Sequence, residues 1–551
     1  MRLCQKAKPS CDAHSVRDRV LGHMHRFARQ EDGVMVILSL YMFLIMILVG
    51  GIGVDLMRFE MERTRLQNTL DRAVLAAADL DQTLDPKDVV MNYFDKSGLG
   101  NHLTRDDVTV TQGVGFRKVQ ATARSTFDTH FMHLTGVETL TAPGAGAAEE
   151  SIGSVEVSLV LDISGSMNSN SRLSRLKPAA RGFVDTILDN SEEGNVSVSV
   201  VPYATQVNAG EALLDQYTTT HEHDYSHCVN FIADEYSKPN LARDVAMQRT
   251  GHFDVFTYSE DPISTPVCPT RAESEILPLS GDRTTLHNHI NSLTAKGNTS
   301  IDIGMKWGTT LLDPGTRSVV SDLVAAGEIS SDFEGRPSDY RDGETLKIVV
   351  LMSDGQNTNQ YMLNPSLRDG DSEVWYNEET GRYSVYKSER ETNYYWPHSN
   401  DWHDHPYGNG TYTQCQWEYV NWQWQYLCSE QDEPGSAVRL TYPELWAQVS
   451  LAWNAYYNYE FSSSAWADWY NSAHTYLNGT AKDQRTDHIC DAAKDEGIIV
   501  FTIGFEAPHS GRRVLKRCAS SASHYFDVEG LEIEEAFASI AASIRKLRLT
   551  Q

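Results

Sequence analysis

Residues 155–166 read VEVSLVLDISGS, an apolar run followed directly by a polar turn that contains glycine. Similar apolar runs, rich in β-branched residues, recur at 196–203 (VSVSVVPY), 346–352 (LKIVVLM) and 497–505 (GIIVFTIGF), and an amphipathic stretch lies at 173–189. Runs that are apolar on both faces and alternate with helices are typical of a parallel sheet covered on both sides. The sequence therefore predicts an α/β fold with a doubly wound, mostly parallel sheet.

Polar side chains directly follow two of these apolar runs, and another lies in a turn between runs. Asp162, Ser164 and Ser166 come directly after the first apolar run, and Asp354 follows the third, within an SDG sequence. Thr299 lies in a GNTS turn between two of the runs. Ligands of open α/β sheets bind at the carboxyl ends of the strands, near the point where the strand order reverses. We therefore expect these five side chains to converge at one edge of the sheet.

Together the five predicted site residues would supply two carboxylates and three hydroxyls. Such an all-oxygen set suits a hard divalent cation and is poorly matched to zinc or copper. Mg²⁺, which keeps several waters when bound, is the expected ion, and the residues leave Mn²⁺ and Ca²⁺ open. An Asp or Glu of a protein partner could then complete the coordination shell. The predicted chemistry is therefore metal-dependent protein binding.

The pattern Asp162-x-Ser164-x-Ser166, with Thr299 in its turn and Asp354 in SDG, resembles the metal-ion-dependent adhesion site (MIDAS) of von Willebrand factor type A domains. All five positions of that motif are present and in order, and an apolar strand pattern precedes the first. The resemblance implies a Rossmann-like domain over residues 152–547. It also implies that these five residues hold the cation and that the ligand is a protein.

The serines do not indicate an enzyme. A nucleophilic serine needs an activating base, and Ser164 and Ser166 are not surrounded by the G-x-S-x-G elbow of serine hydrolases. Metal ligation already accounts for their spacing, so we expect no enzymatic activity. His398, His403 and His405 could form a second metal cluster, but most stretches of this composition are solvated loops.

The N-terminal region contains a membrane-spanning pattern. Residues 33–54 carry no charge, and at about 1.5 Å per residue they form a helix long enough for a hydrocarbon core of about 30 Å. Residues 1–32 carry seven Lys and Arg against four acidic residues, so the positive-inside rule places this tail in the cytoplasm. We expect a single-pass protein of a bacterial inner membrane, with its bulk in the periplasm or outside the cell. A cleaved signal peptide is the alternative, but the leader and the apolar stretch are both long for one.

The charge balance excludes one class of partner. The chain has 47 Lys and Arg against 75 Asp and Glu, a formal net charge of −28. Because the N-terminal tail carries +3, the remainder carries −31. A field of this sign repels polyphosphate, so we expect no nucleic-acid partner, whereas divalent cations are attracted.

Residues 55–150 are expected to form a helical stalk with a small α+β unit. Residues 56–81 contain good helix formers and no Pro or Gly, so the membrane helix is predicted to continue beyond the span. A helix at 86–97 and two alternating runs between residues 108 and 129 predict a short sheet. The small residues of 142–150 (APGAGAAEE) are expected to be a linker.

Three sequences near the anchor resemble the N-terminus of TadG-like proteins of the tight-adherence (Flp) pilus system: RQEDG at 29–33, Val54-Asp55, and LQNTLDRAVLAAA at 66–78. That family couples such an anchor to a type A domain. The resemblance implies assembly or anchoring of Flp-type pili, with pilus or secretion components as partners. Thr69 and Val74 replace small residues that are common in the family's third sequence. The alternative from a different class is a surface adhesin that binds host or matrix ligands through the metal site and an aromatic insertion.

Two long insertions interrupt the predicted sheet domain, at 205–275 and 361–478. The second contains ten of the eleven tryptophans and sixteen of the twenty-five tyrosines. Around 416–426 aromatic and polar residues alternate, which predicts a hairpin or ribbon with one aromatic face. Two interpretations remain open, the core of a subdomain, which is the simpler one, and a contact surface for protein or glycan.

Six cysteines lie beyond the apolar stretch, on the side of the membrane where disulfides persist. They allow many pairings, and sequence alone does not choose among them. Pairing of sequence neighbours closes the shortest loops, so we expect Cys228–Cys268, Cys415–Cys428 and Cys490–Cys518.

Overall fold

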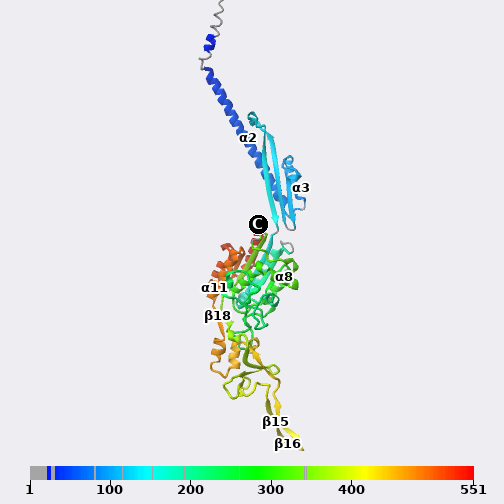
Figure 1. Cartoon of the computed structure of the whole chain (residues 1–551), viewed down its shortest axis with the longest axis vertical. Coiled ribbons are helices and arrows are strands. Elements are labelled where there is room, and N and C mark those ends of the chain that lie inside the picture. Colours follow the sequence, from blue (N-terminus) through cyan, green and yellow to red (C-terminus); the bar gives the residue numbers. More distant parts are fainter. Residues whose placement is uncertain are drawn as a thin grey trace, which may run out of the picture. The chain divides into compact units, whose positions relative to one another are not determined.

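The computed structural model forms two compact units, residues 1–151 and residues 152–551 (Figure 1). Most of the predicted cytoplasmic tail, residues 1–20 and 27–31, lies outside the described residues. The structure describes residues 21–26, 32–79, 82, 84–113, 116–151, 153–189, 194–259, 261–340, 342 and 344–550.

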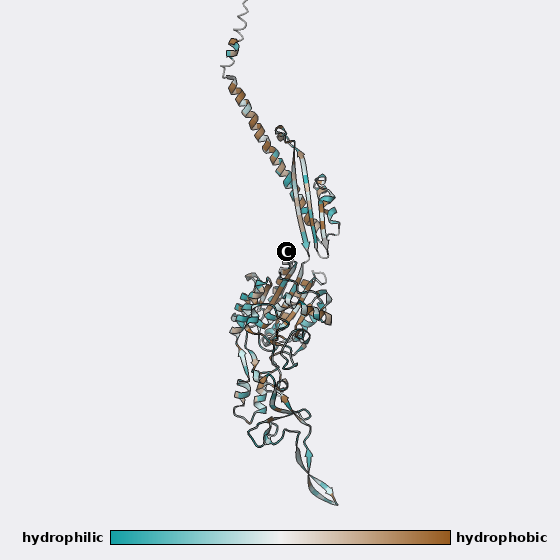
Figure 2. Cartoon of the chain, in the orientation of Figure 1, coloured by the Kyte–Doolittle hydropathy of each residue, from teal (hydrophilic) through white to brown (hydrophobic). Residues whose placement is uncertain are grey.

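A single helix, α2 (Asp32–Ala78), contains the predicted membrane span and continues beyond it without interruption. By length and composition it could cross a membrane. Its first half is apolar on all sides, as the colouring of Figure 2 shows, and the apolar side chains there are exposed. Further along, its apolar side chains form one buried stripe, as predicted: Leu66, Leu70, Val74 and Ala77.

The small unit packs this buried stripe of α2 against a sheet and a second helix. The sheet is antiparallel, in the order β1-β2-β3, with β1 at Val108–Gly113, β2 at Phe116–Asp128 and β3 at Thr139–Ser151, and the helix is α3 (Pro86–Lys96).

The predicted linker at 142–150 is wrong, because these residues belong to β3. A Cβ added to Gly144 would lie 3.3 Å from the side chain of Leu66, and one added to Gly146 would lie 3.3 Å from that of Asp71. Glycine therefore lets the strand approach α2 closely. The small residues reflect this close packing between helix and strand and do not indicate flexibility.

The second unit is built on a six-stranded sheet in the order β20-β19-β9-β4-β5-β8. Neighbouring strands are parallel except for β5 and β8, which are antiparallel. The mixed α/β class is as predicted. The strands are β4 (Ser154–Asp162), β5 (Val196–Tyr203), β8 (Leu277–Ser280), β9 (Thr345–Ser353), β19 (Ile499–Phe505) and β20 (Tyr525–Val528).

Helices pack on both faces of this sheet and enclose two separate apolar cores. Successive residues of β4 alternate between them, with Val160 in one core and Leu159 and Leu161 in the other. One face is covered by α7 (Ile301–Thr310), α8 (Arg317–Ala326), α11 (Gly479–Asp495) and α12 (His509–Cys518), and the other by α4 (Arg172–Leu188), α6 (Arg283–Ser292) and α13 (Glu532–Thr550).

Two glycines of helix α7 face the sheet and leave no room for a larger side chain. A Cβ added to Gly308 would lie 2.5 Å from Val160 Cγ2, and one added to Gly304 would lie 2.7 Å from the ring of Tyr203. We expect Gly308→Ala to lower the free energy of unfolding by about 1–3 kcal/mol, because the added methyl overpacks the core. Urea unfolding of the two proteins measures this loss.

Gly182 provides the matched control, because it lies within α4 and a Cβ added there would meet nothing within 4 Å. Gly182→Ala is expected to raise the free energy of unfolding by about 0.5–1 kcal/mol through its higher helix propensity. An equal gain in Gly308→Ala would contradict the proposed steric limit.

The two insertions share an apolar core, which includes Phe253 and Val267 from the first and Val374 and Trp446 from the second. The described part of the first insertion contains short elements, which include α5 (Glu211–Leu214), β6 (Val229–Asn230), β7 (Gln248–Arg249) and two 3-10 helices. The second forms an antiparallel sheet in the order β14-β13-β12-β11-β17, with bounds Asp401–His403, Tyr394–Trp396, Arg382–Tyr386, Asp371–Asn377 and Ala437–Thr441. Beside it lie a strand pair, β10 (Gln360–Leu363) and β18 (His474–Leu477), and a short helix, α9 (Tyr442–Gln448).

The predicted aromatic hairpin is present as β15 (Thr411–Val420) and β16 (Gln423–Asp432). Its side chains are almost all exposed, so the interpretation as a subdomain core is wrong for the hairpin itself. The core of the insertion is formed instead by residues on either side of it.

All three predicted disulfides, Cys228–Cys268, Cys415–Cys428 and Cys490–Cys518, are confirmed. The first holds together two points of the first insertion, the second joins the two strands of the hairpin, and the third ties α11 to α12.

Candidate metal centre

The first predicted ligand, Asp162, is the last residue of β4, and a tight turn follows it. The backbone N–H of Ser164 donates to Asp162 Oδ1 at 2.8 Å, which folds the chain back over the end of the strand. The N–H of Gly165 donates to the carbonyl of Gly297 at 2.9 Å. A Cβ at position 165 would lie 3.3 Å from that carbonyl oxygen, so glycine allows the two loops to meet.

Four of the five predicted residues are joined directly by hydrogen bonds. Ser164 Oγ lies 3.1 Å from Ser166 Oγ, and Ser166 Oγ donates to Asp354 Oδ1 at 2.7 Å. Ser353, at the end of β9, donates to Asp162 Oδ2 at 2.7 Å. The convergence follows from the sheet, because β4 and β9 are parallel neighbours that end at the same edge.

The fifth residue, Thr299, lies next to this cluster without being hydrogen-bonded to it. Its hydroxyl is 3.5 Å from the point where a Cβ on Gly355 would lie, one residue beyond Asp354. Its backbone N–H donates to Thr358 Oγ1 at 2.9 Å. Within the described residues, no hydrogen bond joins the Thr299 hydroxyl to the other four side chains.

The electrostatics of the cluster favour a cation. Burial, and then the charge of nearby Asp354, raise the pKa of Asp162 to about 7, against hydrogen bonds from Ser164 and Ser353 that lower it. The described residues contain no cluster of three or more His, Cys, Asp or Glu side chains that could hold a metal ion. This site has two carboxylates and otherwise hydroxyls, so the donors present fit a hard divalent cation and not a soft one.

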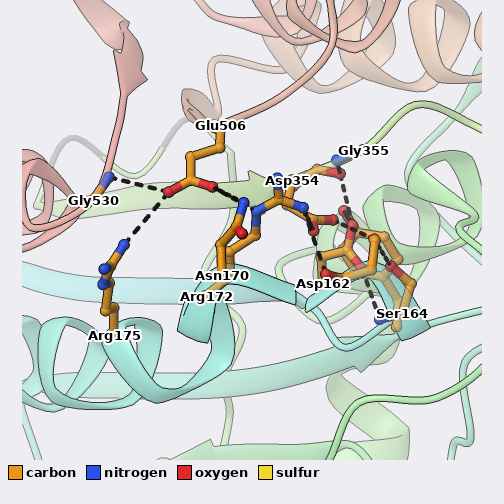
Figure 3. A network of polar contacts seen from close by, with 12 residues as sticks. Asp162, Ser164, Asn170, Arg172, Arg175, Asp354, Gly355, Glu506 and Gly530 are labelled. Atoms are coloured by element: carbon orange, nitrogen blue, oxygen red, sulfur yellow. Dashed lines mark hydrogen bonds and ion pairs between the residues drawn. The ribbon is translucent and has the colours of Figure 1, made fainter. Parts of the chain in front are cut away.

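Two charged residues that the sequence analysis missed complete the site, as Figure 3 shows. Arg172, the first residue of α4, donates from Nη1 to Asp354 Oδ2 at 2.7 Å and from Nε to Glu506 Oε2 at 2.9 Å. Its guanidinium therefore offsets the charge of Asp354 on the side away from Ser166. Glu506 directly follows β19, so the rule that located Asp162 and Asp354 also points to it, whereas no sequence signal marks Arg172.

The sequence analysis also missed Lys482 of α11, which is hydrogen-bonded to the loop that contains Thr299. It is fully buried, and its Nζ donates to the carbonyls of Thr299 and Thr358 at 2.8 Å and 3.0 Å and to Ser300 Oγ at 2.5 Å. Burial lowers its pKa to about 8, while the charge of Asp302 opposes that shift. Lys482 thus ties together two loops that border the candidate site.

The histidines considered for a second metal cluster have other contacts. The ring of His403 stacks on that of Trp396, with centroids 3.3 Å apart. His405 lies between two carboxylates, with Nδ1 2.6 Å from Asp404 and Nε2 3.1 Å from Glu433. These carboxylates raise the pKa of His405 despite its partial burial.

Comparison with solved structures gives low-identity matches. The vWF domain of the type V pili tip protein Mfa5 from Porphyromonas gingivalis is 15% identical with a TM-score of 0.30, covering 72% of this chain and 96% of that one. The adhesive tip pilin GBS104 from Group B Streptococcus agalactiae is 13% identical with a TM-score of 0.28, covering 71% and 99%. Proximal thread matrix protein 1 from the mussel byssus, with a zinc-occupied MIDAS motif, is 10% identical with a TM-score of 0.25, covering 71% and 46%.

No curated protein matches the chain. A family model does match its N-terminal region, over residues 33–80, which include the apolar stretch and the buried stripe of α2. That model is described as "Putative Flp pilus-assembly TadE/G-like", so the resemblance of the anchor to TadG-like pilus-assembly proteins is confirmed for this segment.

Proposed function

We propose that the chain is a membrane-anchored, divalent-metal-dependent protein-binding module that acts in the assembly or anchoring of Flp-type pili. The anchor is the apolar part of α2, with the N-terminus in the cytoplasm and the remainder outside the inner membrane. The binding domain is the second unit, as a doubly wound domain of the von Willebrand factor A type over residues 152–547. The sheet order and the two helical layers support this assignment.

One observation carries the proposal, the meeting of Asp162, Ser164, Ser166 and Asp354 at the carboxyl ends of β4 and β9. Asp162, a buried carboxylate whose pKa is raised by burial and by the charge of Asp354, lies beside the hydroxyl oxygens of Ser164 and Ser166, and a divalent cation would stabilise such a site. The match of residues 33–80 to a pilus-assembly family supports the biological setting.

In this proposal Asp162, Ser164, Ser166, Thr299 and Asp354 hold the ion, and Mg²⁺ is the expected one. The bound ion would supply a positive charge at which a carboxylate of the partner binds. Arg172 and Ser166 fix the two oxygens of Asp354, so this carboxylate keeps its orientation without the partner. The serines donate or accept hydrogen bonds and take no part in bond cleavage.

The proposal predicts that binding to pilus or secretion components requires the metal. The full chain, solubilised in detergent from its own cells, is expected to co-purify with these components in Mg²⁺ and to lose them in chelator. Asp162→Ala is expected to lose them in both buffers and to fail to restore pili in a strain that lacks the chain. Equal recovery of the partners in chelator and in Mg²⁺ would contradict the proposal.

A surface adhesin is the second candidate, and the exposed aromatic hairpin is the observation that favours it. An adhesin would bind host or matrix material through the metal site and the hairpin, while pili would assemble without it. Immunodetection of pili on cells that lack the chain separates the two functions, because only the assembly function predicts their loss.

A further inference from the structure

The β15–β16 hairpin presents two unlike faces to solvent. Trp417 lies opposite Tyr426 and Tyr419 lies opposite Trp424, which places the four rings on one face, since alternate residues of a strand share a face. In each pair the ring centroids are 5.4 Å apart. The four side chains are between 57% and 65% exposed, so the rings are available to a ligand.

Two carboxylates lie on the same face, nearer the base of the hairpin. The register places Glu430 opposite Thr413 and Asp432 opposite Thr411, beyond the Cys415–Cys428 disulfide. Both carboxylates are exposed, and neither has an ion-pair partner among the described residues. We call this surface the aromatic–acidic face. The opposite face carries five glutamines and one carboxylate, Glu418, and its only aromatic ring is that of Tyr412.

Nothing in the hairpin neutralises this face, because residues 411–432 contain no Lys or Arg. Elsewhere in the same insertion, aromatic rings are covered by the chain's own cations. Arg390 lies 4.0 Å from the ring centroid of Trp402, Arg382 lies 4.7 Å from that of Tyr407, and Lys387 lies 5.2 Å from that of Tyr459. Within the described part of the chain, no such cation covers a ring of the hairpin.

A tight turn and a disulfide join the two strands of the hairpin. A two-residue turn, Asn421-Trp422, joins the strands with φ values of 50° and 65°, the left-handed region in which glycine is the usual second residue. A bulky residue is strained in that conformation. Trp422 is 88% exposed, so packing within the described chain does not offset the strain. The disulfide links the strands and limits their separation.

We propose that the aromatic–acidic face is a docking surface for a basic, Lys- or Arg-bearing segment of a protein partner. Ammonium and guanidinium groups bind over the faces of Trp and Tyr, and the carboxylates of Glu430 and Asp432 pair with neighbouring cations. Trp, Tyr and Arg are enriched among the few residues that carry most of the binding energy of protein interfaces. Binding at this surface does not involve the metal site. The docking proposal can therefore be wrong while the proposed function is right, and the reverse.

The negative charge of the hairpin favours a basic segment over an anionic ligand and over a neutral glycan. An anionic membrane surface or acidic polymer would be repelled by the hairpin and by the −31 carried beyond the N-terminal tail. A neutral glycan could stack on the rings and donate hydroxyl hydrogen bonds to Glu430 and Asp432, but it carries no positive charge to offset theirs. A basic segment uses the rings and the carboxylates together.

The test is binding of a fluorescein-labelled peptide with alternating Gly-Arg-Ser-Arg sequence to the full chain in detergent, with chelator present. A matched peptide with glutamine in place of every arginine and a neutral dextran are measured alongside. Fluorescence anisotropy is expected to show tighter binding of the arginine peptide than of either neutral probe. The double variant Trp417→Ala, Trp424→Ala is expected to bind the arginine peptide about tenfold more weakly. The double variant Glu430→Gln, Asp432→Asn is expected to lower both the affinity for this peptide and the dependence of that affinity on salt.

Tyr426→Ala and Tyr412→Ala are matched variants on opposite faces of the same hairpin, and both side chains are exposed. Only Tyr426→Ala is expected to weaken binding of the arginine peptide, whereas attraction by net charge alone would leave the two variants equal. Equal affinities of these two variants, or equal binding of the arginine and glutamine peptides, would overturn the proposal. Tighter binding of dextran would assign the face to a glycan, and self-association that Trp417→Ala removes would assign it to a second copy of the chain.

Discussion

Asp162→Asn is expected to remove the response of the protein to Mg²⁺ and, at the same time, to stabilise the metal-free fold. The wild-type melting temperature should rise in Mg²⁺ and fall in chelator, because an ion that binds only the folded state stabilises it. Without metal, burial and the charge of Asp354 raise the pKa of Asp162 from 3.8 to about 7, so the fold loses stability as the pH rises between these two values and carries the full penalty above them. At pH 8 the neutral amide should therefore raise the free energy of unfolding in chelator by on the order of 2–4 kcal/mol.

The substitution preserves the local hydrogen bonds. The side-chain oxygen of Asn can still accept from the N–H of Ser164, and its amide can donate to Ser353 Oγ, whose hydroxyl rotates. Scanning fluorimetry in Mg²⁺ and in chelator measures both effects. Asp244→Asn, at an exposed position, should leave the wild-type response unchanged. A variant at position 162 that kept the full Mg²⁺ response would contradict the assignment of Asp162 as a ligand.

The sequence was sufficient to locate most of the candidate site, because two simple rules apply to it. Runs of β-branched residues marked β4 and β9, and parallel strands end at the same edge of a sheet, so Asp162 and Asp354 were expected at one edge. The structure brings them together because β4 and β9 are adjacent. Arg172 and Lys482 could not be found in this way. Their roles depend on how α4 and α11 pack on the sheet, and long-range helix packing leaves no local pattern in the sequence.

Composition was misleading in two places for the same physical reason. The glycines and alanines of β3 resemble a linker, yet they are small because α2 lies against them. The alternating aromatics of β15 and β16 resemble a buried face, yet they are exposed. Period-two alternation predicts that a strand has two different faces, but it does not say whether a face meets protein or solvent. That depends on neighbours far away in the sequence.

Lys482→Met is expected to destabilise the protein strongly and to weaken Mg²⁺ binding. The unbranched apolar chain keeps most of the volume but leaves the carbonyls of Thr299 and Thr358 without their buried donor. It also removes the only charge within 4 Å of Asp302 among the described residues, since Lys482 Nζ lies 3.9 Å from Asp302 Oδ1. Breaking one side of a buried charge pair costs about 3–5 kcal/mol, so a loss of that size is expected in urea unfolding.

A double variant separates the charge effect from the loop effect. Adding Asp302→Asn to Lys482→Met removes the unpaired carboxylate, whose oxygens have no hydrogen-bond donor within the described structure, and should recover part of the lost stability. It should not recover Mg²⁺ affinity, because the Thr299 loop still lacks the Lys482 ammonium and the Thr299 carbonyl keeps only Thr358, through its N–H and hydroxyl, as a donor. Lys494→Met on the same helix, where the lysine pairs with exposed Asp491, should change stability by less than about 1 kcal/mol. If the double variant regained wild-type Mg²⁺ affinity, Lys482 would act through the charge of Asp302 alone and not by holding Thr299 in place.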